Sequence, residues 1–107
     1  MPVRFDVDKV TLEEEAEAEY LEAARTYASE ADALADEFEA EVERCAALIA
    51  EHPKAAPLVR GRKIRCKVLR RFPYSLFYAV ETDRIRIVAV AHHKRRPGYW
   101  RPRLSTS

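Results

Sequence analysis

The stretch that decides the fold is Arg84–Arg103, which reads RIRIVAVAHHKRRPGYWRPR. Its first half, residues 85–91, is apolar apart from Arg86 and rich in β-branched side chains, which is typical of a central strand buried on both faces. Its second half, residues 92–103, gathers two His, one Tyr, the only Trp and several Lys and Arg. The stretch therefore predicts a rigid strand that carries a cationic, aromatic cluster to one end of a sheet.

Two further strands are expected before this stretch. Ile64, Cys66 and Val68 alternate with polar residues, as in a half-buried strand, and residues 74–80 (YSLFYAV) form another apolar run. Residues 81–84 (ETDR) then predict a hairpin turn into the final strand. A loop with two Pro and one Gly, residues 53–61, comes before all three strands.

Two amphipathic helices are expected before that loop. We expect Thr11 to cap the first helix, with Glu14 completing a capping box. We expect Ser29 to begin the second helix and His52–Pro53 to end it. Each helix has one apolar stripe at spacings of three and four, and its other faces are mostly polar, as on a solvated surface. The stripes are Leu12, Ala16, Tyr20, Ala23, Ala24 and Tyr27, then Ala31, Leu34, Ala35, Phe38, Val42, Cys45, Ala46 and Ile49.

The chain begins with a further strand. Residues 3–10 alternate apolar and polar side chains, the pattern of a half-buried strand. The element order is therefore β-α-α-β-β-β, and the short connection between the helices makes them an antiparallel hairpin. We expect one α+β domain over residues 1–107, in two layers, with the helical hairpin packed on an antiparallel sheet.

The net charge of +1 conceals two halves of opposite charge. Residues 1–52 hold 16 acidic and four basic residues, a balance of −12, and residues 53–107 hold two acidic and 15 basic residues, a balance of +13. This split favours a dipolar molecule with one anion-binding face. The alternative is that the two halves neutralise each other within the fold.

Several classes of protein and site do not fit the sequence. It has no apolar run near the length of a membrane span, and MPVRFDVDKV at the N-terminus lacks the pattern of a signal peptide, so we expect a cytoplasmic protein. Cys45 and Cys66 form no CxxC pair and have no His at zinc-like spacing, which predicts free thiols and no metal site. The chain also lacks a Gly-rich phosphate loop, and we expect no cofactor.

Candidate binding residues lie in the basic half. Arg62, Arg65 and Lys67 have strand spacing, which suits charge-assisted contacts to a phosphate backbone. The alternative is an ordinary solvated sheet face. The full set expected to bind nucleic acid or another target is Arg62, Arg65, Lys67, Arg71, Arg95 and Arg96.

The cluster HHKRRPGYW, residues 92–100, is the stronger candidate for a site. His92 and His93 point to opposite faces if the strand persists, so at most one joins a given site. Such a His has the chemistry of a base near neutral pH, while a neighbouring Arg stabilises charge on a phosphate.

Tyr99 and Trp100 in this cluster each have two interpretations. Tyr99 either stacks on a base or donates a proton, or else it fastens the C-terminal segment to the core. For Trp100 we favour the fastening role.

Together these features resemble the RelE/ParE family of toxins from bacterial type II toxin–antitoxin systems. The resemblance covers nearly the whole chain and implies a helical hairpin on an antiparallel sheet, with the first strand beside the last. The features that carry it are, in order, the acidic helical hairpin ending in His52–Pro53, Arg62-x-x-Arg65, Phe72-Pro-Tyr-Ser-Leu-Phe-Tyr78, Ile87-Val-Ala-Val-Ala-His92 and Arg95-Arg-Pro-Gly-Tyr-Trp100.

The resemblance implies a growth-inhibiting toxin, of the plasmid-stabilisation type, that a cognate antitoxin neutralises in a hetero-oligomeric complex. RelE-like members cleave ribosome-bound mRNA without a metal, whereas ParE-like members poison DNA gyrase. A degenerate member that only binds its antitoxin is a third possibility. In a ribonuclease the expected catalytic residues are His92, His93, Arg95 and Tyr99.

Two departures from the ribonuclease pattern favour the gyrase-poison side. Ser75 stands where ribonucleases of this family often have Arg. In addition, His92 or His93 replaces the Arg that those enzymes carry at the end of the last strand.

Overall fold

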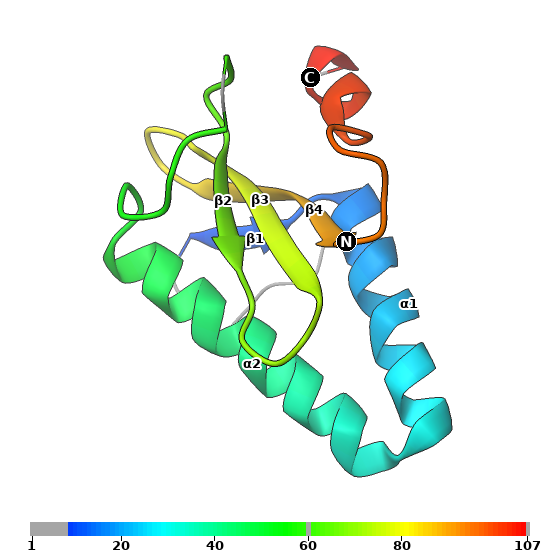
Figure 1. The fold of residues 1–107 in the computed structure, drawn as a ribbon. Helices are drawn as coiled ribbons and strands as arrows, with labels where there is room; N and C mark the ends of the chain where they lie inside the picture. The colour runs from blue at the N-terminus through cyan, green and yellow to red at the C-terminus, as the bar shows by residue number, and fades with distance from the viewer. Residues whose placement is uncertain (1–8, 60, 107) are drawn as a thin grey trace.

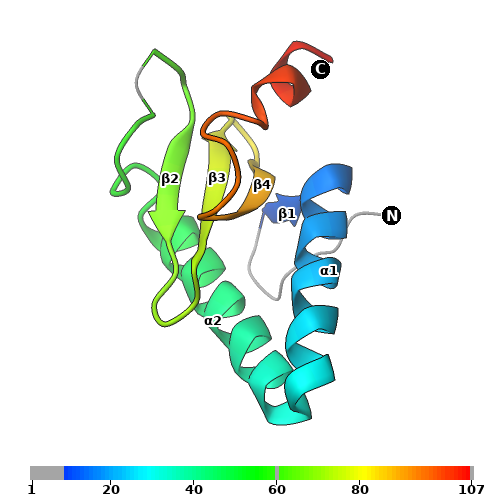
Figure 2. The ribbon, with the colours of Figure 1, turned by 45° about the vertical axis from the view of Figure 1, so that its right-hand side comes forward.

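The computed structural model describes residues 9–59 and 61–106. Figure 1 shows the helical hairpin on one side of the sheet, and Figure 2 shows the C-terminal segment beyond its other side. The α+β class and the helical hairpin are confirmed. The elements are β1 (Val10–Leu12), α1 (Glu14–Glu30), α2 (Asp32–Glu51), β2 (Arg65–Val68), β3 (Tyr74–Val80), β4 (Ile85–His92) and the 3₁₀ helix η1 (Arg101–Thr106).

The sheet has the strand order β1-β4-β3-β2, so β4 lies inside it as predicted. Six of the eight residues of β4 are buried, the exceptions being Arg86 and His92. β4 pairs antiparallel with β3 but parallel with β1. The sheet is therefore mixed rather than wholly antiparallel. A parallel pair needs a long crossover between its strands, and the helices, β2 and β3 provide it here.

The first strand could be checked only in part. The predicted strand over residues 3–10 lies mostly outside the described residues, because the description begins at residue 9. Within the described part, β1 runs from Val10 to Leu12 and pairs with residues 85–87 of β4. The first strand therefore lies beside the last, as expected.

The predicted capping box at the start of α1 is wrong. Thr11 is the middle residue of β1 and pairs with Arg86, and α1 begins at Glu14. Glu13, the residue before the helix, stays extended because its N–H donates to the carbonyl of Ile87 at 2.9 Å. Its carboxylate accepts a hydrogen bond from Arg86 at 2.7 Å. Strand pairing thus delays the helix by two residues.

The boundary between the helices also differs from the prediction. Ser29 does not begin α2 but lies in the last turn of α1, where its hydroxyl donates to the carbonyl of Thr26 at 2.6 Å. The helical conformation is interrupted at Ala31, whose backbone is extended with φ −166° and ψ 136°. The helical end at His52 is confirmed.

The larger core lies between the helices and the sheet, and the two predicted stripes face each other there except at Ala31, which is exposed in the break between the helices. Phe38 is its centre and is fully buried. Ring centroids of four neighbours lie 5.3–5.8 Å from that of Phe38. These neighbours are Tyr20, Tyr27, Phe72 and Tyr74. Aromatic pairs at such distances add to the stability that burial alone supplies.

A smaller core covers the other face of the sheet. Trp100 is 2% exposed and its ring centroid lies 4.7 Å from that of Phe77 on β3. Ile64, Val88 and Ala89 are buried in the same cluster. The prediction that Trp100 fastens the C-terminal segment to the core is confirmed.

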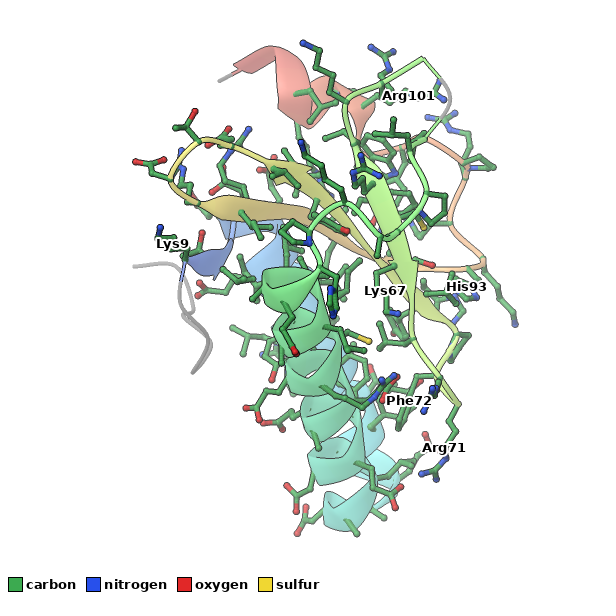
Figure 3. All side chains as sticks on the ribbon, turned by 90° about the vertical axis from the view of Figure 1, so that its left-hand side faces the viewer. Lys9, Lys67, Arg71, Phe72, His93 and Arg101 are labelled. Carbon is green, nitrogen blue, oxygen red and sulfur yellow. The ribbon has the colours of Figure 1, made fainter. Side chains whose placement is uncertain are left out.

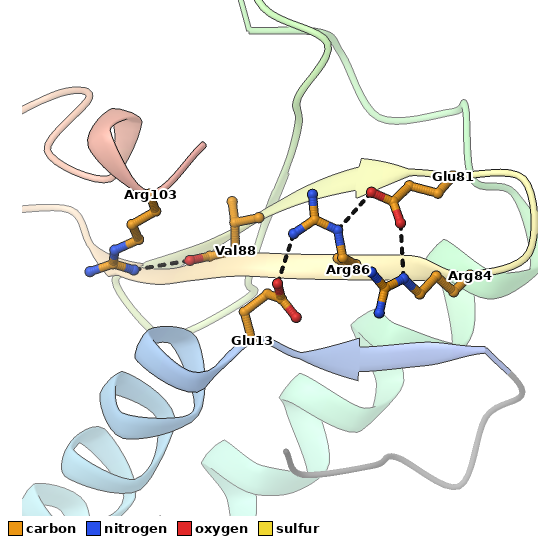
Figure 4. A network of polar contacts seen from close by, with 6 residues as sticks. All are labelled: Glu13, Glu81, Arg84, Arg86, Val88 and Arg103. Carbon is orange, nitrogen blue, oxygen red and sulfur yellow. Dashed lines mark hydrogen bonds and ion pairs between the residues drawn. The ribbon is translucent and has the colours of Figure 1, made fainter. Parts of the chain in front are cut away.

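Arg86 is the charged residue that interrupts the apolar run of β4, and two carboxylates accept hydrogen bonds from its guanidinium (Figure 4). It donates to Glu81 at 2.7 Å and to Glu13 at 2.7 Å, and only 13% of its side chain is exposed. Arg84 donates to the second oxygen of Glu81 at 2.9 Å. Hydrogen bonds from Arg84 and Arg86 hold the pKa of Glu81 below its ordinary value. The acidic helical half and the sheet are therefore joined by ion pairs as well as by the core.

Glu41 on α2 fastens the turn between β2 and β3. Its carboxylate accepts two hydrogen bonds from Arg44, each 2.8 Å long, and one from the backbone N–H of Arg70, 2.6 Å long. The hydrogen bonds from Arg44, with that of Arg70, lower the pKa of Glu41 from 4.5 to about 2.

Glu41→Gln is expected to reduce the free energy of unfolding at pH 7 by about 1.5–3 kcal/mol, because a charged acceptor of three hydrogen bonds is lost. The folded-state pKa is depressed, so the carboxylate stabilises the fold above pH 4.5, and this contribution disappears as the pH falls toward 2. Urea titrations of the wild type and of Glu41→Gln at several pH values measure the difference in free energy of unfolding. An equal difference at pH 7 and pH 2 would contradict the assignment, and Glu37→Gln, at an exposed ion pair, serves as the control.

Candidate functional site

A cavity of about 230 Å³ lies where β3 begins, β4 ends and the chain turns into the C-terminal segment. The structure brings the four expected catalytic residues to this one cavity together with Arg96. The lining consists of Ser75, Phe77, Ala91, His92, His93, Arg95, Arg96, Pro97, Gly98, Tyr99 and Trp100.

The two His side chains leave the end of β4 in different directions, yet both line this cavity, so the expectation that at most one of them joins a given site is wrong. The His92 ring lies edge-on to Tyr74, 4.9 Å between centroids, and its Nδ1 accepts a hydrogen bond from the Lys94 N–H at 3.0 Å. His93 lies on the other face, where its Nε2 is 2.9 Å from the hydroxyl of Ser75. Ser75 is 6% exposed, so the hydrogen bond joins a buried hydroxyl to an exposed imidazole.

Tyr99 is held by a carboxylate on α1. Its hydroxyl donates to Glu19 at 2.5 Å, and the same carboxylate accepts two hydrogen bonds from Arg103, at 2.9 and 3.0 Å. Burial and the hydrogen bond to Glu19 raise the pKa of Tyr99 well above its ordinary value. The phenol therefore retains its proton at neutral pH and directs it toward Glu19.

An irregularity in β4 lies beside the backbone groups that contact Glu19 and Arg103. The register between β3 and β4 shifts near Phe77, which places Val88 and Ala89 together in the smaller core. Beyond the end of β1, the carbonyl of Val88 accepts a hydrogen bond from Arg103 at 2.9 Å (Figure 4), and the N–H of Val90 donates to Glu19 at 3.0 Å. Side chains thus replace a neighbouring strand along this edge.

Arg95 and Arg96 line the cavity without a carboxylate partner among the described residues. The guanidinium of Arg95 lies 3.9 Å from the centroid of the Tyr99 ring, a cation–π contact that leaves its N–H groups available. The acidic residues of the basic half, Glu81 and Asp83, follow β3 at the opposite end of β4. The carboxylates nearest to this cavity are those of Glu19 and Glu22, which line the adjoining cavity together with Arg95.

The other expected binding residues lie elsewhere. Arg65 donates to the carbonyls of Lys54 and Ala56 at 3.0 and 2.7 Å, so it fastens the loop before β2. Lys67 lies beside the C-terminal end of α2, and Arg71 forms an exposed ion pair with Glu37 at 3.3 Å. Arg62 precedes β2. Figure 3 labels Lys67, Arg71 and His93, and shows Arg101 apart from them on the C-terminal segment. Of the six expected binding residues, only Arg95 and Arg96 line the cavity.

Two residues of the site had no assigned role in the sequence. Glu19 looked like part of a solvated helix face, although it lies three residues after Ala16 and four before Ala23, at the border of the apolar stripe. In the sequence, Ser75 stands out only as a departure from Arg. A polar residue inside the apolar run YSLFYAV was the signal that this position needs a partner.

Comparison with known families assigns the fold. Residues 10–97 match the family described as ParE toxin of type II toxin-antitoxin system, parDE. The chain belongs to the ParE toxin family. Its membership confirms the resemblance and implies an antitoxin as partner of this ParE-family toxin. A search of curated proteins finds no match for the chain. In the part of the chain that the structure describes, neither α1 nor α2 has the length and apolar character of a membrane span.

Proposed function

We propose that this ParE-family toxin inhibits growth by poisoning DNA gyrase in the cytoplasm, and that it does not cleave RNA. The observation that carries the proposal is the state of Tyr99. A general acid must release its proton near neutral pH, whereas the Tyr99 proton is committed to Glu19 and the pKa of the phenol is raised.

The position of Arg65 supports the same proposal. A ribonuclease of this family would need basic residues of β2 and the C-terminal cluster on one phosphate. Arg65 instead donates to two loop carbonyls and pairs across the strands with the buried Tyr78. Tyr78 belongs to the core on the helix side, whereas Trp100 belongs to the core on the other face. A gyrase poison needs a binding surface and no proton transfer, which these residues satisfy.

RNA cleavage is the second candidate, favoured by one observation. His92, His93, Arg95 and Tyr99 line a single cavity, so a base and a charge-stabilising guanidinium are within one site. In that case His93 is the base, because Ser75 fixes its ring while Nδ1 faces away from that hydrogen bond.

Single substitutions distinguish the two candidates. Tyr99→Phe, His92→Gln and His93→Gln are expected to remain toxic, because a poison keeps its contact surface when a proton donor is lost. Loss of an acid or base in a ribonuclease costs about 10²–10⁴-fold in rate. Growth arrest after induction and primer extension on ribosome-bound mRNA measure the two outcomes.

The controls concern folding and activity of the wild type. Each variant must retain the wild-type circular dichroism spectrum and bind the cognate antitoxin, which we propose covers the cationic end of the sheet. Loss of toxicity in His93→Gln together with mRNA cuts by the wild type would contradict gyrase poisoning and support RNA cleavage. A wild type that neither arrests growth nor cuts mRNA would identify a protein that only binds its antitoxin.

A further inference from the structure

The turn that follows β4 is held by a side chain as well as by the backbone. The N–H of Arg95 donates to the carbonyl of His92 at 3.0 Å, and the N–H of Lys94 donates to Nδ1 of the His92 ring at 3.0 Å. The N–H of His93 donates to the carbonyl of Pro73 at 2.8 Å, which joins the start of the turn to the residue before β3. The imidazole of His92 is therefore one of the acceptors that fix residues 92–95.

The hydrogen bond from Lys94 defines the protonation state of the His92 ring. A backbone N–H only donates, so Nδ1 is the acceptor and carries no proton, and the neutral ring holds its proton on Nε2. A second proton would bind to Nδ1, and two N–H donors would then face each other. Histidine is the side chain that ordinarily changes its charge between about pH 8 and pH 5. Acidification in this range therefore removes the hydrogen bond between Lys94 and His92.

The position of Arg95 depends on this turn. Its guanidinium lies 3.9 Å from the centroid of the Tyr99 ring, and the hydrogen bond from Tyr99 to Glu19 holds that ring in place. The backbone of Arg95 is fastened to the carbonyl of His92, so a rearranged turn moves the guanidinium relative to the ring. The charged surface at the end of the sheet thus changes with the state of His92.

A protonated His92 ring has an acidic neighbourhood on its other side. His92 lines the cavity of about 390 Å³ between α1 and the end of β4, together with Glu19 and Glu22 of α1. Glu19 already accepts hydrogen bonds from Tyr99 and Arg103, whereas the Glu22 side chain is 72% exposed. Glu22 is therefore the carboxylate that can accept an imidazolium. The other titratable or charged side chains that face His92 or share its two cavities are Tyr74 on β3 and His93, Arg95, Arg96 and Tyr99 after β4.

We propose that His92 is a pH-sensitive latch on the turn at the end of β4. Its unprotonated Nδ1 holds residues 92–95 in the turn that places Arg95 on the Tyr99 ring, and protonation opens this turn and directs the imidazolium toward Glu22. The latch has two distinct states, because Nδ1 cannot carry a proton and accept one hydrogen bond from Lys94 at the same time. The proposal concerns the toxin alone and is independent of the target that it acts on.

NMR spectroscopy of the ¹⁵N-labelled full-length toxin, from about pH 8 to about pH 5, tests the latch. At the upper pH the imidazole nitrogen signals of His92 are expected to show a proton on Nε2 and none on Nδ1. On acidification the amide hydrogen of Lys94 should exchange roughly fivefold to tenfold faster, after correction for the intrinsic rate, because one hydrogen bond is lost. The side-chain signals of Arg95 should lose their ring-current shift from Tyr99 over the same pH range.

His92→Asn separates the latch from a general effect of pH. The Oδ1 atom of Asn stands at the same number of bonds from the backbone as Nδ1 of His, accepts from the N–H two residues later, and takes up no proton in this pH range. The exchange of the Lys94 amide and the Arg95 signals should therefore change less than about twofold with pH in this variant. His93→Gln is the matched control, because it removes the neighbouring imidazole and leaves His92, so the full pH response should remain.

Three results would each overturn the proposal. The first is a proton on Nδ1 of His92 at the upper pH, and the second is Lys94 exchange that does not accelerate on acidification. The third is a pH response that persists in His92→Asn or disappears in His93→Gln, which would assign it to another group. The nitrogen signals and the exchange rate are measured on the wild type, so they decide the matter even if His92→Asn fails to fold.

Discussion

Truncation of Phe38 to Ala is expected to lower the free energy of unfolding by about 3–5 kcal/mol, the cost of deleting a fully buried aromatic ring. The ring is 0% exposed and touches aromatic side chains from α1, from β3 and from the turn between β2 and β3. These surroundings belong to three separate segments, so they cannot collapse together to fill the space. Urea denaturation followed by tryptophan fluorescence and circular dichroism measures the loss.

Leu21→Ala is the matched control for Phe38→Ala. Leu21 lies on α1 but is 45% exposed, and its truncation should cost less than about 1 kcal/mol. A cost for Phe38→Ala below about 1 kcal/mol would show that this face of the helical hairpin is not core.

Glu19→Ala is expected to destabilise the protein by about 3 kcal/mol, because it leaves Arg103 charged, largely buried and without its carboxylate. The side chains of Glu19 and Arg103 are 17% and 18% exposed, and the Tyr99 hydroxyl loses its acceptor as well. The C-terminal segment should loosen first. Hydrogen exchange of residues 99–104 and urea denaturation follow the two effects.

Glu22→Ala provides the comparison, one turn further along α1. Its pair with Arg25 has 71–72% of each side chain exposed, and such pairs contribute less than about 1 kcal/mol. A Glu19→Ala variant as stable as Glu22→Ala, with unchanged exchange in the C-terminal segment, would contradict the role given to this carboxylate. Glu19→Gln, which keeps an acceptor for Tyr99, should fall between the two.

The elements were predictable where the periodicity of the sequence agrees with the tertiary structure. The apolar run of β4 and the stripe around Phe38 each report burial directly, and both predictions hold. The helix starts were not predictable in this way. Thr11 has the local chemistry of a helix cap, but its backbone pairs with Arg86 on β4 and so belongs to the sheet. Strand pairing with a residue 75 positions away cannot be read from the local sequence.

The candidate site was predictable as a cluster but not as a set of partners. Residues 92–100 are contiguous, so the strand that ends at His92 brings them to one place. The partner of Tyr99 lies 80 positions earlier in the chain, on a helix rich in Glu whose sequence does not set Glu19 apart. Arg65 shows the converse problem, because strand spacing alone does not reveal that loop carbonyls occupy its guanidinium.

The most direct test of the proposed function is supercoiling of relaxed plasmid DNA by purified bacterial gyrase in the presence of the purified toxin. We expect that the wild type and Tyr99→Phe both inhibit supercoiling, that gyrase-cut linear DNA accumulates, and that the cognate antitoxin restores gyrase activity. Undiminished supercoiling at a large excess of toxin, with cleavage of ribosome-bound mRNA by the same preparation, would contradict it.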